Sequence, residues 1–163
     1  MKATGIVRRI DDLGRVVVPK EIRKVLRIRE GDPLEIYTSA SGEIILKKYS
    51  PISELGQTAE LFVETAASVL ELPVLVSDTD RFVATAGVKQ KEYLNKEIDD
   101  ELDTIIQQKE VFNSDSKVVV PILTNGDPIG AVMLLSTEKT RIGEAEIKAA
   151  RLGASFLASQ MQD

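Results

Sequence analysis

The sequence predicts an α+β protein built in two parts. The first part reads as a small β unit with one short helix whose strands interleave with those of a second copy, and the second as an antiparallel sheet with flanking helices. Charge separates the parts: residues 1–50 hold 11 Lys and Arg against 7 Asp and Glu, a net of +4, whereas residues 51–163 hold 10 against 19, a net of −9. Strands in which apolar residues do not alternate with polar ones are typical of the first part. The element order helix, two strands, helix, two strands, helix is typical of the second.

The N-terminal part contains alternating strand and turn signals around one helix. "TGIVRRI" (residues 4–10) and "GRVVV" (residues 14–18) are rich in β-branched residues and are separated by the turn "DDLG". "PKEIRKVL" reads as a short helix, because Pro19 suits a helix start. The turns "GDP" and "ASGE" then introduce two more predicted strands, "LEIYTS" and "IILKK".

The apolar strands of this part predict a dimer. Val16, Val17 and Val18 follow one another without a polar residue, a pattern of strands buried on both faces. Fifty residues without a disulfide or a metal enclose too little apolar volume to bury such strands alone. We therefore predict an obligate homodimer through residues 1–50, in which the strands of two chains interleave around one core.

A domain boundary is predicted near "KKYSPIS" (residues 47–53), with a hinge and helix start at residues 51–55. Ser50 is suited to cap a helix and Pro51 to occupy its first turn. The helix is expected to run to Leu72. Its apolar positions step by 3 and 4 residues, which is a heptad pattern that fits packing on its own domain or contact with another subunit. These positions are Ile52, Leu55, Ala59, Phe62, Ala66 and Val69.

The remainder, residues 56–163, reads as a single sheet with helices. "PVLVSD" and "RFVATAG" are predicted strands, and "NKEIDDELDTIIQQKE" is a predicted acidic amphipathic helix. "SKVVVPILTNGDPIGAVMLLST" reads as a hairpin that turns at Asn125-Gly126. The last predicted helix spans residues 142–161, and its small residues would allow another helix to pack closely.

Composition excludes several kinds of chemistry. The chain has no cysteine and no histidine, so thiol nucleophiles, Cys-ligated zinc and the commonest general base are absent. We expect no enzyme, no catalytic residue and no metal site; the alternative is an enzyme that uses carboxylates or Lys in the second part. "DDELD" (residues 99–103) does not have the spacing of a calcium loop. No signal peptide or membrane span is recognisable, which predicts a cytoplasmic protein without a membrane partner.

Seven of the 21 cations lie within residues 8–27 and form the predicted DNA-binding set. Four of them have helix offsets of 0, 3, 4 and 7, which places them on one helix face opposite an apolar face. Five of the seven are arginines, whose planar fork matches phosphate oxygens or the guanine edge. The alternative is a solvated charged surface with local ion pairs. The set is Arg8, Arg9, Arg15, Lys20, Arg23, Lys24 and Arg27.

The stretch "MKATGIVRRIDDLGRVVVPKEIRKVLRIREGDPLEIY" closely resembles the DNA-binding domain of the AbrB-like transition-state regulators of bacteria. The resemblance covers residues 1 to about 50 and implies a swapped-hairpin β-barrel dimer that binds double-stranded DNA. It places the family's DNA-contacting positions on Arg8, Arg15, Arg23 and Lys24. Lys24 departs from the family, whose best-known member has arginine there, and a lysine loses the bidentate geometry.

The whole layout resembles members of this family whose second domain is similar to a GAF domain, a small-molecule sensor fold. That resemblance implies a regulator of sporulation genes, activator and repressor, which acts as a homotetramer in the forespore on DNA that is A·T-rich. No cofactor is predicted, because a bilin would need Cys and a ligated haem His. An unidentified effector remains open, with Arg81 or Lys117 as phosphate partners, and so does a pure oligomerisation scaffold.

A second alternative is the antitoxin of a toxin–antitoxin module, in which the swapped-hairpin fold also occurs. Such proteins carry a short, poorly ordered acidic tail. Here the acidic part has regular helix and strand periodicity, which predicts a folded domain instead of a tail.

Overall fold

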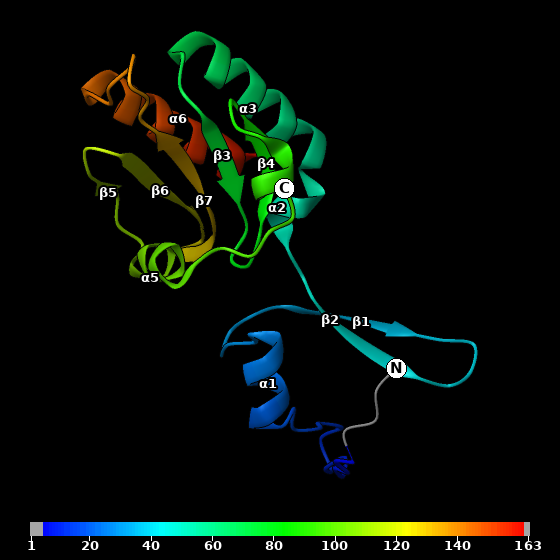
Figure 1. Cartoon of the computed structure of the whole chain (residues 1–163). Helices are drawn as coiled ribbons and strands as arrows, with labels where there is room; N and C mark the ends of the chain where they lie inside the picture. The colour runs from blue at the N-terminus through cyan, green and yellow to red at the C-terminus, as the bar shows by residue number, and fades with distance from the viewer. Residues whose placement is uncertain (1–4, 162–163) are drawn as a thin grey trace. The chain divides into compact units, whose positions relative to one another are not determined.

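The computed structural model describes residues 5–161 of the chain. The chain divides into two compact units, residues 1–49 and residues 50–163 (Figure 1). Each unit contains helix and antiparallel strands, so the predicted α+β class is confirmed.

The N-terminal unit contains one helix and one hairpin. Helix α1 (Lys20–Leu26) follows Pro19, as the sequence predicts. Strands β1 (Leu34–Thr38) and β2 (Ile44–Lys48) pair antiparallel over their whole length. The helix and the hairpin thus form where turn residues and β-branched runs predict them.

The other two strands predicted for this unit are not formed within the chain. Residues 5–10 and 15–18 carry no strand pairing; Thr4, the first residue of the earlier segment, lies outside the described residues. A strand exists only where a neighbouring strand satisfies its backbone N–H and C=O groups. Within the described chain the sheet of this unit is limited to β1 and β2, so these two segments have no strand to pair with.

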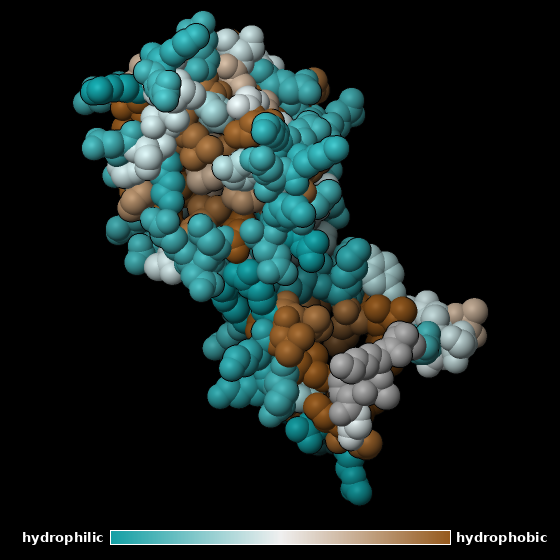
Figure 2. All heavy atoms as spheres, viewed as in Figure 1, coloured by the Kyte–Doolittle hydropathy of each residue, from teal (hydrophilic) through white to brown (hydrophobic). Residues whose placement is uncertain are grey.

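The N-terminal unit leaves its apolar residues exposed. Among residues 5–49 Pro19 alone is buried, and no branched aliphatic or aromatic side chain is; Val17 is 67% exposed, Val25 80% and Ile36 70%. Figure 2 shows a broad hydrophobic surface on this unit. An exposed apolar surface of this kind is typical of a protein interface.

The second unit is a five-stranded antiparallel sheet with helices on both faces, in the strand order β4-β3-β7-β6-β5. The predicted order of helices and strands is confirmed, with the short elements α4 and β5 added. The elements are α2 (Pro51–Glu54), α3 (Gly56–Leu70), β3 (Val74–Ser77), β4 (Phe82–Ala86), α4 (Gln90–Tyr93), α5 (Asp100–Gln108), β5 (Phe112–Asn113), β6 (Lys117–Thr124), β7 (Asp127–Leu135) and α6 (Glu144–Ser159).

Each face of the sheet buries its own apolar core, beneath helices that Figure 1 shows on either side of the sheet. Helices α3 and α6 cover one face, where Ile52, Val63 and Leu157 are buried. Helix α5 covers the other face, where Leu75 and Ile106 are buried. Because the central strands are buried on both sides, β3 is continuously apolar up to Ser77 instead of alternating.

The helix predicted for residues 51–72 is interrupted. Ser50 caps α2 as predicted, since its hydroxyl oxygen accepts the Ser53 N–H at 3.3 Å. The chain then leaves helical geometry at Leu55 before α3 begins. The heptad positions divide accordingly: Ile52 and Ala59 are buried in the unit's own core, whereas Val69 is exposed.

The hairpin of β6 and β7 turns at Asn125-Gly126, as predicted. Both residues have positive φ, 52° and 82°, the conformation that a two-residue hairpin turn requires. Small residues of α6 also act as expected: a Cβ on Gly153 would collide with the ring of Phe62, so glycine lets α3 and α6 approach closely.

Candidate nucleic-acid interface

The turn before α1 holds Arg15 in place. The Asp11 carboxylate accepts the backbone N–H groups of Leu13 at 3.0 Å and Arg15 at 2.8 Å. Its second oxygen accepts the Arg15 Nε–H at 2.8 Å. The Arg15 side chain nevertheless stays 71% exposed. Because Nε is the bonded atom, the terminal N–H groups of the guanidinium remain directed to solvent, where they could meet a phosphate.

Asp11 titrates below the usual range of a carboxyl group. The backbone N–H of Arg15 lowers the pKa of Asp11 most, and the Arg15 side chain lowers it further. Both hydrogen bonds favour the charged carboxylate. The stabilisation of the turn is therefore present above the unfolded pKa of about 4. It is lost only as the pH falls through the lowered folded pKa.

We expect the Asp11 carboxyl to titrate at a lower pH than the value of about 3.9 that is usual for an aspartate. Carboxyl ¹³C chemical shifts in the full chain measure its midpoint. In an Arg15→Gln variant the Asp11 midpoint should rise but stay below that usual value, because the backbone N–H of residue 15 remains. An Asp11 midpoint at or above the usual value in the unmodified protein would contradict the role assigned to Asp11.

Helix α1 presents Lys20, Arg23 and Lys24 to solvent, and it has no buried residue. Arg23 folds back toward the helix start, where its Nε–H donates to the Val18 carbonyl at 3.1 Å. As with Arg15, the terminal N–H groups of the fork are left for other contacts. The opposite face is apolar, and Leu26 on it is exposed.

Arg27, the last member of the predicted set, ends α1 instead of continuing it. It is the C-cap residue in the left-handed conformation, with φ 56° and ψ 39°. The Ile28 N–H donates to the Arg23 carbonyl at 2.8 Å, the bond that closes such a cap. Lys48 Nζ donates to the Arg27 carbonyl at 2.9 Å and thereby ties this cap to the end of β2.

The two arginines nearest the N-terminus have different surroundings. Arg8 lines an apolar groove of about 400 Å³, together with Ile6 and Val17. Arg9, the next residue along the chain, is exposed and does not line this groove. The groove is completed by Val16, Val18, Pro19, Ile22, Leu26, Ile28, Ile44 and Leu46.

Two residues hold cations of the set in place: Asp11 holds Arg15, and Lys48 holds the cap that carries Arg27. Asp11 is one of the three acidic residues, with Asp12 and Glu21, that the sequence offers as local ion-pair partners for the basic set. The sequence reasoning missed Lys48. Nothing local indicates it, because Lys48 lies 21 residues from its partner.

The cations suggested for an effector phosphate in the second unit are engaged elsewhere. Lys117 Nζ donates to Glu101 Oε2 at 2.8 Å and lies 5.7 Å from the centre of the Phe112 ring. Arg81 donates to the Asn95 carbonyl at 3.5 Å. The two therefore serve separate local contacts.

Within residues 5–161, no group of three or more acidic side chains is placed to hold a metal ion. No helix in the same range has the length and apolar character needed to cross a membrane.

Comparison with known proteins covers the whole chain. Residues 54–162 match the family model described as stage V sporulation protein T C-terminal, transcription factor. Residues 7–54 match the model described as antidote-toxin recognition MazE, bacterial antitoxin.

Three relatives illustrate the similarity. Stage V sporulation protein T of Bacillus subtilis is 52% identical over 99% of each chain. The transition state regulatory protein AbrB of the same organism is 54% identical over 37% of this chain and 62% of that protein. The GAF domain of an Acinetobacter phosphoenolpyruvate-protein phosphotransferase is 13% identical, covers 68% of this chain and 87% of that chain, and has a TM-score of 0.55. This last likeness shows that the second unit has the GAF fold.

Proposed function

The chain belongs to the stage V sporulation protein T family of transcription factors, and from this membership we propose that it regulates sporulation genes by binding double-stranded DNA through its N-terminal unit. The observation that carries the proposal is the solvent-facing basic set on α1 and the turn before it, within a region similar to AbrB. A transcription factor needs no catalytic step, so no residue is assigned to one.

The cations would bind the DNA backbone through their charge and through the planar geometry of the arginine side chains. Arg15 and Arg23 each have an engaged Nε and free terminal N–H groups, which can take two oxygens of one phosphate. Lys20 and Lys24 act as point charges. Arg8, Arg9 and Arg27 add to the positive field. Neutralised phosphates release counterions, which makes affinity depend strongly on salt.

Sequence preference would come mainly from DNA shape. Few side chains of the basic set are suited to reading base edges, so deformability of the duplex has to contribute. We propose a preference for A·T-rich sites, whose narrow minor groove attracts arginine. Activation and repression would both be possible, depending on where a site lies relative to a promoter.

The DNA-binding form is proposed to be a dimer through residues 1–50. The exposed apolar groove around Arg8 and Val17 would be closed by the same surface of a second chain. Residues 5–10 and 15–18, which lack strand pairing within one chain, would gain partners from that second chain. Pairing would thus bury the apolar residues and double the number of cations on one surface.

Two dimers would join through helices α3 and α6 of the second unit. A groove of about 380 Å³ runs between these helices, and Thr65 is the one polar side chain among its lining residues. Leu152 is 73% exposed and Phe156 44%. A tetramer held there would link two DNA-binding surfaces and add avidity. We propose that it acts in the forespore cytoplasm, where sporulation genes are transcribed.

The antitoxin alternative has support from the N-terminal match alone. Residues 50–161 argue against it, since they form a folded sheet with a buried core on each face instead of a tail that wraps a toxin. The second unit is better suited to holding dimers together, with or without an effector.

We expect the full-length protein to bind a 30-base-pair A·T-rich duplex more tightly than a G·C-rich duplex of equal length. Fluorescence anisotropy from 50 to 300 mM KCl measures both affinities. The slope of log affinity against log salt should be about −5 or steeper, because each neutralised phosphate contributes about −0.9. A slope near zero with either duplex would rule out phosphate contact by the basic set.

A further inference from the structure

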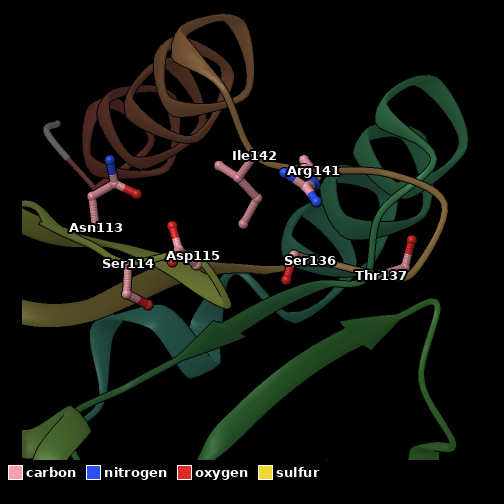
Figure 3. Close-up of a pocket in the computed structure, with 7 residues that line it drawn as sticks. All are labelled: Asn113, Ser114, Asp115, Ser136, Thr137, Arg141 and Ile142. Carbon is pink, nitrogen blue, oxygen red and sulfur yellow. The ribbon is translucent and has the colours of Figure 1, made fainter.

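A polar pocket in the second unit has no part in the proposed DNA binding or assembly. Its volume is about 490 Å³, within the usual range of small-molecule sites. Three short segments form it: the β5–β6 connection and, about 20 residues further along the chain, the end of β7 and the loop that leads from it to α6 (Figure 3). Its lining residues are Asn113, Ser114, Asp115, Ser136, Thr137, Arg141 and Ile142.

Hydrogen bonds hold two of these segments without using the pocket's charges. The Ser136 N–H donates to the Ser116 carbonyl at 2.8 Å, and the Ser136 hydroxyl donates to the same oxygen at 3.1 Å. The loop after β7 closes on itself, because Thr137 N–H donates to the Thr140 carbonyl and Thr140 N–H donates to Thr137 Oγ1, each at 3.0 Å. The walls of the pocket are therefore preformed.

The pocket holds one positive and one negative side chain, and neither is engaged. Within residues 5–161, Arg141 and Asp115 make no side-chain hydrogen bond or ion pair, with each other or with any other group. Figure 3 shows Asp115 on the β5–β6 side and Arg141 on the loop that leads to α6. Arg15 and Lys117, by contrast, both have carboxylate partners.

This charge arrangement selects the chemistry of a ligand. A simple anion would meet the Asp115 carboxylate, and a simple cation would meet the Arg141 guanidinium; each repulsion disfavours binding. An apolar ligand would desolvate the hydroxyls and both charges. A molecule with a carboxylate and an ammonium group satisfies both side chains at once.

We propose that this pocket binds a zwitterionic small molecule of the free α-amino-acid class. Arg141 takes the carboxylate through its bidentate fork, and Asp115 takes the ammonium group. Thr137 Oγ1 already accepts a backbone N–H, so its own hydrogen is free to donate to the carboxylate. Ser136 donates its hydrogen to Ser116, so its oxygen is free to accept from the ammonium group. The proposed function leaves open whether the second unit binds an effector, and the inference deepens it by naming the class of that effector.

The test uses the full-length protein and the twenty common L-amino acids, each examined by saturation-transfer NMR and then by calorimetry. At least one is expected to bind. Arg141→Gln and Asp115→Asn should each weaken that binding about tenfold or more, the loss expected for one charged hydrogen-bonding group. Lys148→Gln and Asp127→Asn, exposed charges outside the pocket, are the matched controls and should change it less than about twofold.

Two companion probes separate a zwitterion site from a simple ion site. The decarboxylated amine and the deaminated acid of the bound amino acid should each bind at least about tenfold more weakly than the amino acid. Binding of the acid alone at full strength, binding unaffected by either pocket variant, or no binding of any amino acid would overturn the proposal. The DNA affinity of Arg141→Gln, measured without amino acids, should equal that of the unmodified protein. Loss of amino-acid binding can therefore be distinguished from loss of DNA binding.

Discussion

Replacing Arg15 and Arg23 together by Ala is expected to abolish measurable DNA binding at 150 mM salt. Each arginine supplies charged hydrogen bonds worth about 1.5–3 kcal/mol. A dimer carries each substitution twice, so a single replacement should weaken binding about 10²- to 10⁴-fold. Anisotropy titrations across salt measure the loss. The salt slope of each single variant should also become shallower by about 2, one lost phosphate contact per chain.

Two matched variants show whether the fork or only the charge is required. Arg23→Lys keeps the charge, so the salt slope should be preserved while affinity falls by the loss of bidentate contact. Lys91→Ala removes an exposed cation from the short helix α4 of the second unit and should leave both quantities unchanged. Equal losses in Lys91→Ala and Arg23→Ala would show that overall charge, and not the basic set, determines binding.

The same two arginines illustrate what sequence can and cannot predict about the site. Their place on or beside a short basic helix follows from local spacing, which is why α1 and the turn before it were predicted. The Nε contacts of Arg15 and Arg23 involve Asp11 and Val18, four and five residues away, and depend on the turn's actual geometry. Arg27 fits the helical spacing, but it caps the helix. The periodicity of the side chains does not show where the backbone leaves helical geometry.

The fold also contains elements that local sequence predicts and elements that depend on distant partners. Hairpin β6–β7 was predicted in full, since its turn dipeptide and its apolar strands are local signals. The strands of residues 5–10 and 15–18 were expected from equally good local signals, yet they do not form within one chain. A strand forms only beside another strand, and in the proposed dimer a second chain would supply it. The pocket around Arg141 could not be predicted, because its lining joins the β5–β6 connection to the β7–α6 connection, which only the sheet brings together.

Replacing Val17 by Asp is expected to separate the N-terminal units, whereas Leu152→Asp should separate the second units. Val17 lies in the apolar groove of the first unit, and Leu152 lies in the groove between α3 and α6. Both are exposed in the single chain, 67% and 73%, so neither substitution should disturb a core that already exists there. An unpaired charge buried in an interface costs several kcal/mol, enough to break either contact.

The two variants should differ in the assembly and the DNA binding that each retains. Leu152→Asp is expected to sediment as a dimer that still binds one DNA site, with less avidity on duplexes carrying two sites. Val17→Asp should lose DNA binding on every duplex, because Pro19 is the one buried residue among residues 5–49, and in the proposed dimer this unit needs the second chain to form a core. Limited proteolysis should then digest residues 5–49 and spare residues 50–161, whose two cores are complete within one chain. A double variant, Val17→Asp with Leu152→Asp, that sedimented as a single chain and kept a protease-resistant N-terminal unit would show that this unit folds alone. The exposed valines would then need another explanation than a shared core.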